Sequence, residues 1–122
     1  MILADTSVWI SHIREGEPDL QRALVDAKVL MHPFVLGEIA CGNLRARSQT
    51  LHGLGRLPCP VSASNDEVLA LLEQHHLFGK GLGWVDAHLL ASARLTGCRL
   101  WTLDQSLLDA ATALKVGYSA VI

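Results

Sequence analysis

The sequence alternates short apolar runs with longer segments of helical periodicity, and this alternation restricts the possible folds more than any other feature. The short runs have the length of buried strands and lie at residues 1–5, 28–32, 98–104 and 118–122. Helical segments are predicted at residues 7–14, 18–27, 34–47, 64–77, 84–97 and 105–114. Strands that alternate with helices form parallel sheets covered on both faces. We therefore expect a three-layer α/β/α sandwich with a short-stranded, mainly parallel central sheet.

Residues that favour helix ends mark several of these boundaries. Thr6 or Ser7 is expected to cap the first helix, because a side-chain oxygen there can accept from an unpaired backbone N–H. Ser64 or Asn65 is expected to play the same part at the helix over residues 64–77. Gly97 follows an amphipathic segment, which is typical of a helix C-terminus.

Length and composition indicate one domain in a reducing compartment. A chain of 122 residues can bury an ordinary core, so residues 1–122 are expected to form a single domain. No apolar stretch approaches the roughly 18 residues of a membrane span, and no basic segment precedes the first apolar run. The three cysteines form no CxxC pair and are interpreted as buried thiols: Cys41, Cys59 and Cys98. We expect a cytoplasmic protein.

Four acidic residues lie where an apolar environment is expected. Asp5 and Asp104 each end an apolar run, and the carboxyl ends of parallel strands meet at one edge of the sheet, where ligands bind. Asp86 has leucine or alanine three, four and seven residues later, which predicts a buried helix face. Glu38 has apolar or small residues at the same helical spacings. An unpaired buried carboxylate would cost several kcal/mol or be forced to protonate.

A shared divalent cation would neutralise these four carboxylates. Few basic residues lie near them in the sequence, whereas oxygen ligands are those that Mg²⁺ and Mn²⁺ prefer. For a single acid, a helix cap or a solvated turn explains the residue equally well. For the set of four, we expect a metal site formed by Asp5, Glu38, Asp86 and Asp104.

The segments around these acids resemble the four acidic motifs of PIN-domain ribonucleases, specifically the VapC-type toxins of toxin-antitoxin pairs. The segments are ILADTSVWI around Asp5, LGEIACG around Glu38, GLGWVDAHLLASA around Asp86 and LWTLDQSL around Asp104. They occur in the family's order and span nearly the whole chain. The resemblance implies a PIN-like fold and a metal-dependent endoribonuclease whose cleavage leaves a 5′-phosphate and a 3′-hydroxyl.

The resemblance also assigns roles to individual residues. It makes the four acids the catalytic and metal-binding quartet, and we expect Asp5 and Asp86 to bind the ion directly. Glu38 and Asp104 are then further ligands or acids that orient water. Ser7 and Thr102 match positions that usually carry small polar side chains supporting the site. An ion bound there would make water more acidic and offset charge on the scissile phosphate.

An RNA substrate requires local positive charge, because the net charge of the chain is −2. Arg45 and Arg47 follow the Glu38 segment, Arg56 lies further along, and Lys80 lies in the glycine-rich loop before Asp86. Of these possible phosphate contacts, Arg45, Arg47 and Lys80 are the favoured candidates. The three tryptophans lie within apolar runs and are expected in the core: Trp9, Trp84 and Trp101.

The resemblance further implies a separately encoded VapB-type antitoxin that blocks the acidic groove. The apolar fraction of 50% leaves surface for such a partner or for a homodimer, and the apolar stretches 7–13 and 33–42 are the candidates.

Two alternatives from other classes remain. A phospho-receiver signalling domain has a similar length and a parallel sheet with acids at the strand ends. It would require a pair of adjacent acids at the first strand and a lysine just past the last strand, and Asp5 stands alone. The second alternative is a non-catalytic module that uses the same fold only to bind a partner. The complete set of four acids argues against it, and a metal titration would distinguish it from a nuclease.

Overall fold

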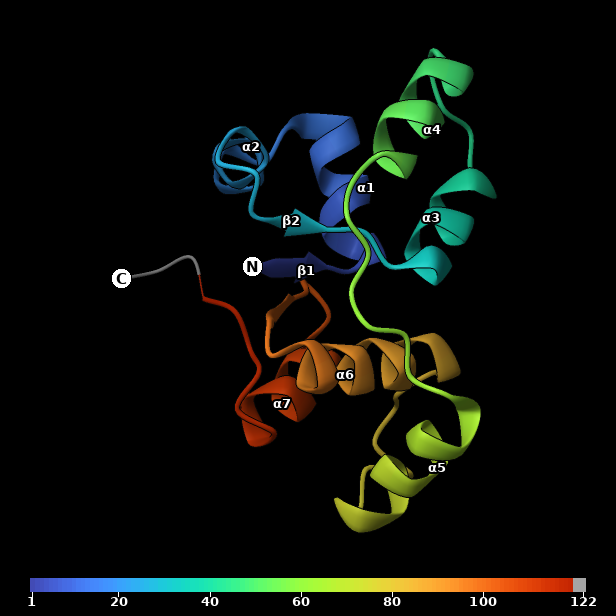
Figure 1. Cartoon of the computed structure of the whole chain (residues 1–122), viewed down its shortest axis with the longest axis vertical. Helices are drawn as coiled ribbons and strands as arrows, with labels where there is room; N and C mark the ends of the chain where they lie inside the picture. The colour runs from blue at the N-terminus through green and yellow to red at the C-terminus, as the bar shows by residue number, and fades with distance from the viewer. Residues whose placement is uncertain (120–122) are drawn as a thin grey trace.

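The computed structural model describes residues 1–119 and is built on a small open sheet of three parallel strands (Figure 1). The strands are β1 (Ile2–Ala4), β2 (Val29–Leu30) and β3 (Arg99–Trp101), in the order β2-β1-β3. In the register, Leu3 pairs with Leu30 on one side and with Leu100 on the other. Because all strands run the same way, their carboxyl ends lie at one edge of the sheet.

Seven helices within residues 1–119 surround the strands. In Figure 1 the first four lie on one side of the sheet and the last three on the other, as the three-layer prediction requires. Their bounds are α1 (Thr6–Glu15), α2 (Pro18–Val25), α3 (Pro33–Ala40), α4 (Arg47–Gly55), α5 (Asn65–Gln74), α6 (Trp84–Thr96) and α7 (Gln105–Ala113). The predicted α/β fold is confirmed.

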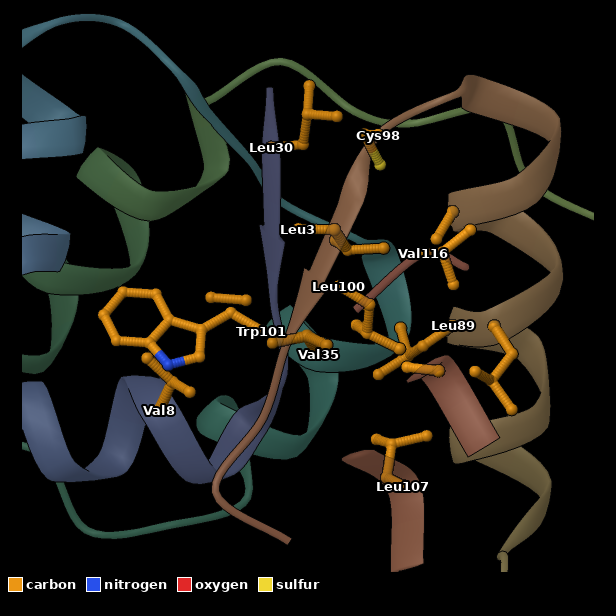
Figure 2. Close-up of a cluster of buried hydrophobic side chains, with 14 of the residues drawn as sticks. Leu3, Val8, Leu30, Val35, Leu89, Cys98, Leu100, Trp101, Leu107 and Val116 are labelled. Atoms are coloured by element: carbon orange, nitrogen blue, oxygen red, sulfur yellow. The ribbon is translucent and has the colours of Figure 1, made fainter. Parts of the chain in front are cut away.

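The hydrophobic core lies on both sides of β1 and β3. Leu3 and Leu100 are fully buried, and Figure 2 shows them among side chains from α1, α3, α6 and α7. The buried face predicted around Asp86 is confirmed, because Leu89, Leu90 and Ala93 are buried. The strands read as continuous apolar runs because both of their faces are covered.

Two predicted helix boundaries were wrong. The segment 34–47 is not one helix: α3 ends at Ala40, and a turn with Ala46 in the left-handed region (φ 47°) precedes α4. Asp5, not Thr6 or Ser7, caps α1, since its carboxylate accepts the Val8 N–H. Ser64 caps α5 as predicted, with Glu67 completing a capping box.

The predicted last strand falls partly outside the described residues, since it extends over 120–122. In the described part, Gly117 forms an isolated parallel bridge with Leu100, and the Tyr118 N–H donates to the Leu100 carbonyl. The chain therefore adds a short third pairing, on the other side of β3 from β1.

The cysteines and the tryptophans each include buried and exposed members. Cys98 is buried, and burial raises the pKa of its thiol, but Cys41 and Cys59 are exposed, so the expectation for those two was wrong. Trp9 and Trp101 lie in the core as predicted, whereas Trp84 is 43% exposed at the start of α6. No helix of residues 1–119 has the length and apolar character needed to cross a membrane.

Candidate active site

Asp5 occupies the carboxyl end of β1 and is buried, with 6% of its surface exposed. Its backbone N–H donates to the Trp101 carbonyl at 2.9 Å, which fixes it to the end of β3. One carboxylate oxygen, Oδ1, accepts from the Ser7 hydroxyl at 2.5 Å and from the Val8 N–H at 3.2 Å. The other, Oδ2, accepts from the Thr102 hydroxyl at 2.5 Å. Both carboxylate oxygens of this buried side chain therefore have hydrogen-bond donors.

The same two hydroxyls connect Asp5 to the loop between β3 and α7. Ser7 Oγ accepts the Leu103 N–H, and Thr102 Oγ1 accepts the Asp104 N–H, both at 3.0 Å. Since each hydroxyl donates to Asp5, each one links a backbone N–H of the loop to the carboxylate. Ser7 and Thr102 therefore position Asp5 and the approach to Asp104 together.

Asp104 and Glu38 flank this centre in more exposed positions. Asp104 caps α7, and its Oδ1 accepts the Leu107 N–H at 3.3 Å. Glu38 lies on α3 and accepts the Thr6 hydroxyl at 2.6 Å, which connects α3 to the start of α1. The sequence treated Thr6 only as a helix cap, so its contact with Glu38 was missed. Its position directly after Asp5 was the available signal.

Asp86 is the half-buried member of the set, in the first turn of α6. Its Oδ2 accepts the Gly83 N–H at 3.0 Å. Burial raises the pKa of Asp86, the Gly83 N–H partly opposes that rise, and the negative charges of Asp104, Asp5 and Glu38 raise it further. The structure thus brings the four acids from β1, α3, α6 and the end of β3 into one electrostatic neighbourhood.

The expected burial of Glu38 was wrong. Glu38 is exposed, and so are three of the residues at helical spacing around it, Phe34, Cys41 and Gly42, whereas the fourth, Val35, is buried. One side of α3, with Phe34 and Glu38, borders solvent, and the adjacent side, with Val35 and Ile39, packs in the core. Apolar spacing alone could not separate these two faces, because α3 is apolar almost all round.

The residue types fit a hard divalent cation, because all four contribute carboxylate oxygens without histidine or thiolate. Within residues 1–119, no three acidic, histidine or cysteine side chains converge closely enough to hold an ion between them. Instead, each of the four carboxylates accepts a hydrogen bond from a neighbouring N–H or O–H. Each carboxylate thus has its own local donor, and a divalent cation bound there would further offset the like charges.

The three candidate RNA contacts differ in their surroundings. Arg45 and Lys80 are exposed. Arg47 is also exposed, but its guanidinium donates to the carbonyls of Ala40 and Gly42 at the end of α3. Arg47 therefore stabilises the turn between α3 and α4 by pairing carbonyls that the helix leaves unpaired.

Comparison with known proteins agrees with this fold. A profile of the PIN domain matches residues 2–113. Ribonuclease VapC32 of Mycobacterium tuberculosis, in strains CDC 1551 / Oshkosh and ATCC 25618 / H37Rv, is 44% identical over 108 residues, covering 88% of this chain and 87% of the relative. The crystal structure of PAE2754 from Pyrobaculum aerophilum covers 88% of this chain and 77% of its own, with a TM-score of 0.60 and 19% identity.

The chain belongs to the PIN-domain family. Its identity to VapC32 makes it a ribonuclease of the VapC type within that family, which confirms the resemblance found in the sequence. At 19% identity the archaeal protein shows the fold alone. The phospho-receiver alternative was wrong.

Thr102→Val tests the hydroxyl link between Asp5 and Asp104. The substitution removes a donor to Asp5 and the acceptor of the Asp104 N–H, so the free energy of unfolding should fall by about 1–2 kcal/mol. RNA cleavage should fall about tenfold or more, since hydrogen bonds that orient a metal ligand have effects of that size. Urea denaturation and initial cleavage rates measure the two effects. Thr102→Ser, which retains the hydroxyl, is the control; equal losses in both variants would contradict the link.

Proposed function

We propose that this chain is the toxin of a type II toxin-antitoxin pair and hydrolyses RNA with Mg²⁺ or Mn²⁺ bound at its acidic quartet. The observation that supports this most strongly is that Asp86, Asp104, Asp5 and Glu38 come from separate elements and lie within electrostatic range of one another: burial does most to raise the pKa of Asp86, and the other three carboxylates raise it further. Such a concentration of negative charge destabilises a protein unless a cation offsets it.

The four acids take different parts in the proposed reaction. Asp5 and Asp86 would bind the ion directly, and Glu38 and Asp104 would act as further ligands or orient the attacking water. A bound divalent ion supplies Lewis-acid stabilisation of the charge that develops on the phosphate and increases the acidity of water. Ser7, Thr6 and Thr102 hold Asp5 and Glu38 in fixed orientations. Water adds to phosphorus while the bond to the 3′ oxygen breaks, giving a 5′-phosphate and a 3′-hydroxyl.

Substrate phosphates would be held by the exposed Arg45 and Lys80, and Arg47 would shape the turn that presents Arg45. The exposed side chain of Arg45 lies next to a hollow formed by the end of α1 and the turn after α3. Long side chains with fixed charge suit phosphate contacts that position RNA without reading its sequence.

A VapB-type antitoxin is the proposed partner. A mainly apolar groove of about 350 Å³ lies between α1, α2 and α4, and its lining includes Trp9, Ile13 and Leu54. Part of the predicted partner stretch 7–13 therefore borders an open groove. We also propose a homodimer and a cytoplasmic location, which agree with the apolar composition and the exposed thiols.

Cleavage of a labelled total-RNA pool tests the activity. The wild-type protein should cleave RNA in the presence of Mg²⁺ or Mn²⁺, and cleavage should stop when the ion is chelated. Glu38→Gln should reduce cutting, whereas Asp26→Asn should not, because Asp26 is exposed at the end of α2. Cutting that continues at the same rate in chelator would overturn the metal-dependent mechanism.

A further inference from the structure

Three aromatic rings form a row between the starts of α3 and α6, outside the acidic quartet. The Phe34 and His88 ring centroids lie 4.8 Å apart at an interplanar angle of 65°, and those of Trp84 and His88 lie 4.8 Å apart at 84°. His88 is buried between the two outer rings, whereas Phe34 and Trp84 are 42% and 43% exposed. Two large aromatic surfaces thus face solvent at one place.

Hydrogen bonds position the central ring of the row and the backbone that carries Phe34. His88 Nε2 lies 3.1 Å from Asn65 Oδ1, which sets the orientation of the central ring. His32 caps α3 by accepting the Phe34 N–H on Nδ1 at 3.0 Å, and the His32 and Phe34 rings lie 5.1 Å apart. A rigid aromatic surface binds a flat partner with little loss of side-chain entropy.

Both helices that carry the outer rings also carry a member of the quartet. Phe34 lies one helical turn before Glu38 on α3, an axial rise of about 6 Å. Trp84 begins α6 two residues before Asp86. Figure 1 shows the start of α3 facing the start of α6 across the edge of the sheet where the strands end. A nucleotide with its phosphate at the acids would carry its base past these rings.

We propose that Phe34 and Trp84 form a stacking surface for an RNA base next to the scissile phosphate and so influence where the RNA is cut. This inference rests on the proposed ribonuclease function and adds residues that determine specificity. Stacking on exposed aromatic rings is a common way in which proteins hold unpaired bases.

The surroundings favour a base over a protein partner. Beside Phe34 on α3 the exposed residues are Pro33, Gly37 and the charged Glu38, so the aromatic surface borders a carboxylate. A stable protein interface buries about 800 Å² on each side and excludes charge from its centre. Two rings beside an acidic centre match a single base better than a second chain.

Cleavage of a random-sequence single-stranded RNA pool, with the cut sites sequenced, tests the proposal on the full chain with Mg²⁺ or Mn²⁺. Trp84→Leu and Phe34→Leu should each lower cleavage roughly tenfold, mainly through KM, and should weaken the nucleotide preference beside the cut. Trp84→Phe keeps an aromatic ring and should retain most of the cleavage activity and most of the nucleotide preference. Leu95→Ala, a comparably exposed change further along α6, should behave as wild type.

An abasic nucleotide separates stacking from a structural effect. In the most frequently cut sequence, removing the base beside the cut should slow wild type about as much as Trp84→Leu does. The combined change should cost little more, because both remove the same contact. If the losses from the abasic substrate and from Trp84→Leu add, the stacking proposal is wrong. It is also wrong if Trp84→Leu cleaves at the wild-type rate with the wild-type nucleotide preference. Either result would leave the ribonuclease function standing.

Sedimentation of the same variants measures their oligomeric state and so tests whether a second copy of the chain, in place of an RNA base, covers the aromatic row. If Trp84→Leu dissociates an oligomer, the row is a subunit contact and the base-stacking proposal is wrong. If wild type cuts no RNA with either ion, the ribonuclease function fails and the stacking proposal fails with it.

Discussion

Asp5→Asn is expected to lower RNA cleavage by about a hundredfold or more while the protein stays folded. Asp5 is the only buried acid of the quartet, and it joins the ends of β1 and β3 through its backbone N–H. Removing its charge lowers both the affinity for a cation and the electrostatic stabilisation of the reaction, and single groups of this kind are worth 10²–10³ in rate, to order of magnitude.

The amide replacement keeps the local hydrogen bonds. Its oxygen can still accept from Ser7 and Val8, and its NH₂ group can donate to Thr102 Oγ1. Cleavage rates and far-ultraviolet circular dichroism, measured on the same preparation, separate chemistry from folding. Asp5→Ala is the contrasting variant, because it also removes the α1 cap and should cost about 1–2 kcal/mol of stability. An active Asp5→Asn protein would contradict its assigned role.

Asp86→Asn is expected to stabilise the metal-free protein and to abolish its stabilisation by metal. In the folded protein, burial and three nearby negative charges raise the pKa of Asp86 above the value of an unfolded chain. As pH rises, the Asp86 carboxyl therefore loses its proton at a lower pH in the unfolded state than in the folded state. The protonated carboxyl stabilises the folded protein fully below the unfolded-state pKa, and this stabilisation is lost as pH rises through the folded-state pKa. Near neutral pH the wild-type protein has lost this stabilisation. The Asp86→Asn protein keeps it, because the amide side chain carries no charge.

Thermal unfolding in chelator measures this effect, with an expected rise in Tm of roughly 1–3 °C near neutral pH for Asp86→Asn. The difference should disappear in acid, where the wild-type carboxyl is protonated. Added Mn²⁺ should raise the Tm of wild type but not that of the variant. A lower Tm for the variant at neutral pH would show that the Gly83 N–H contact outweighs the repulsion.

The acids at strand ends could be located from sequence because strand and loop follow directly from apolar runs. Asp5 and Asp104 end such runs, and a parallel sheet brings their positions to one edge. Asp86 was identifiable for a related reason, since its spacing to Leu89, Leu90 and Ala93 describes a buried helix face. The rule of parallel strands thus predicted the fold and the placement of Asp5 and Asp104, and helical spacing predicted the placement of Asp86.

Other features depended on contacts between distant segments. The exposure of Glu38 follows from which side of the uniformly apolar α3 packs on the core, and its contact with Thr6 spans 32 positions. The aromatic row joins Phe34 to His88 across two helices. Trp84 was expected in the core because it lies in an apolar run, but its side of the first turn of α6 is exposed, while Ala87 and His88 nearby are buried. Periodicity identifies faces, whereas tertiary packing decides which of them is covered.

Calorimetric titration of Mn²⁺ into the metal-free protein near neutral pH tests most directly whether the four acids form one metal site. Wild type and Asp26→Asn should bind the ion, and Asp5→Asn and Asp86→Asn should show little or no heat of binding under the same conditions. Asp26 lies before β2, at the opposite edge of the sheet from the quartet, so it controls for the loss of one negative charge. Mn²⁺ binding of equal strength in wild type and Asp86→Asn would contradict the assignment of the quartet as the metal site.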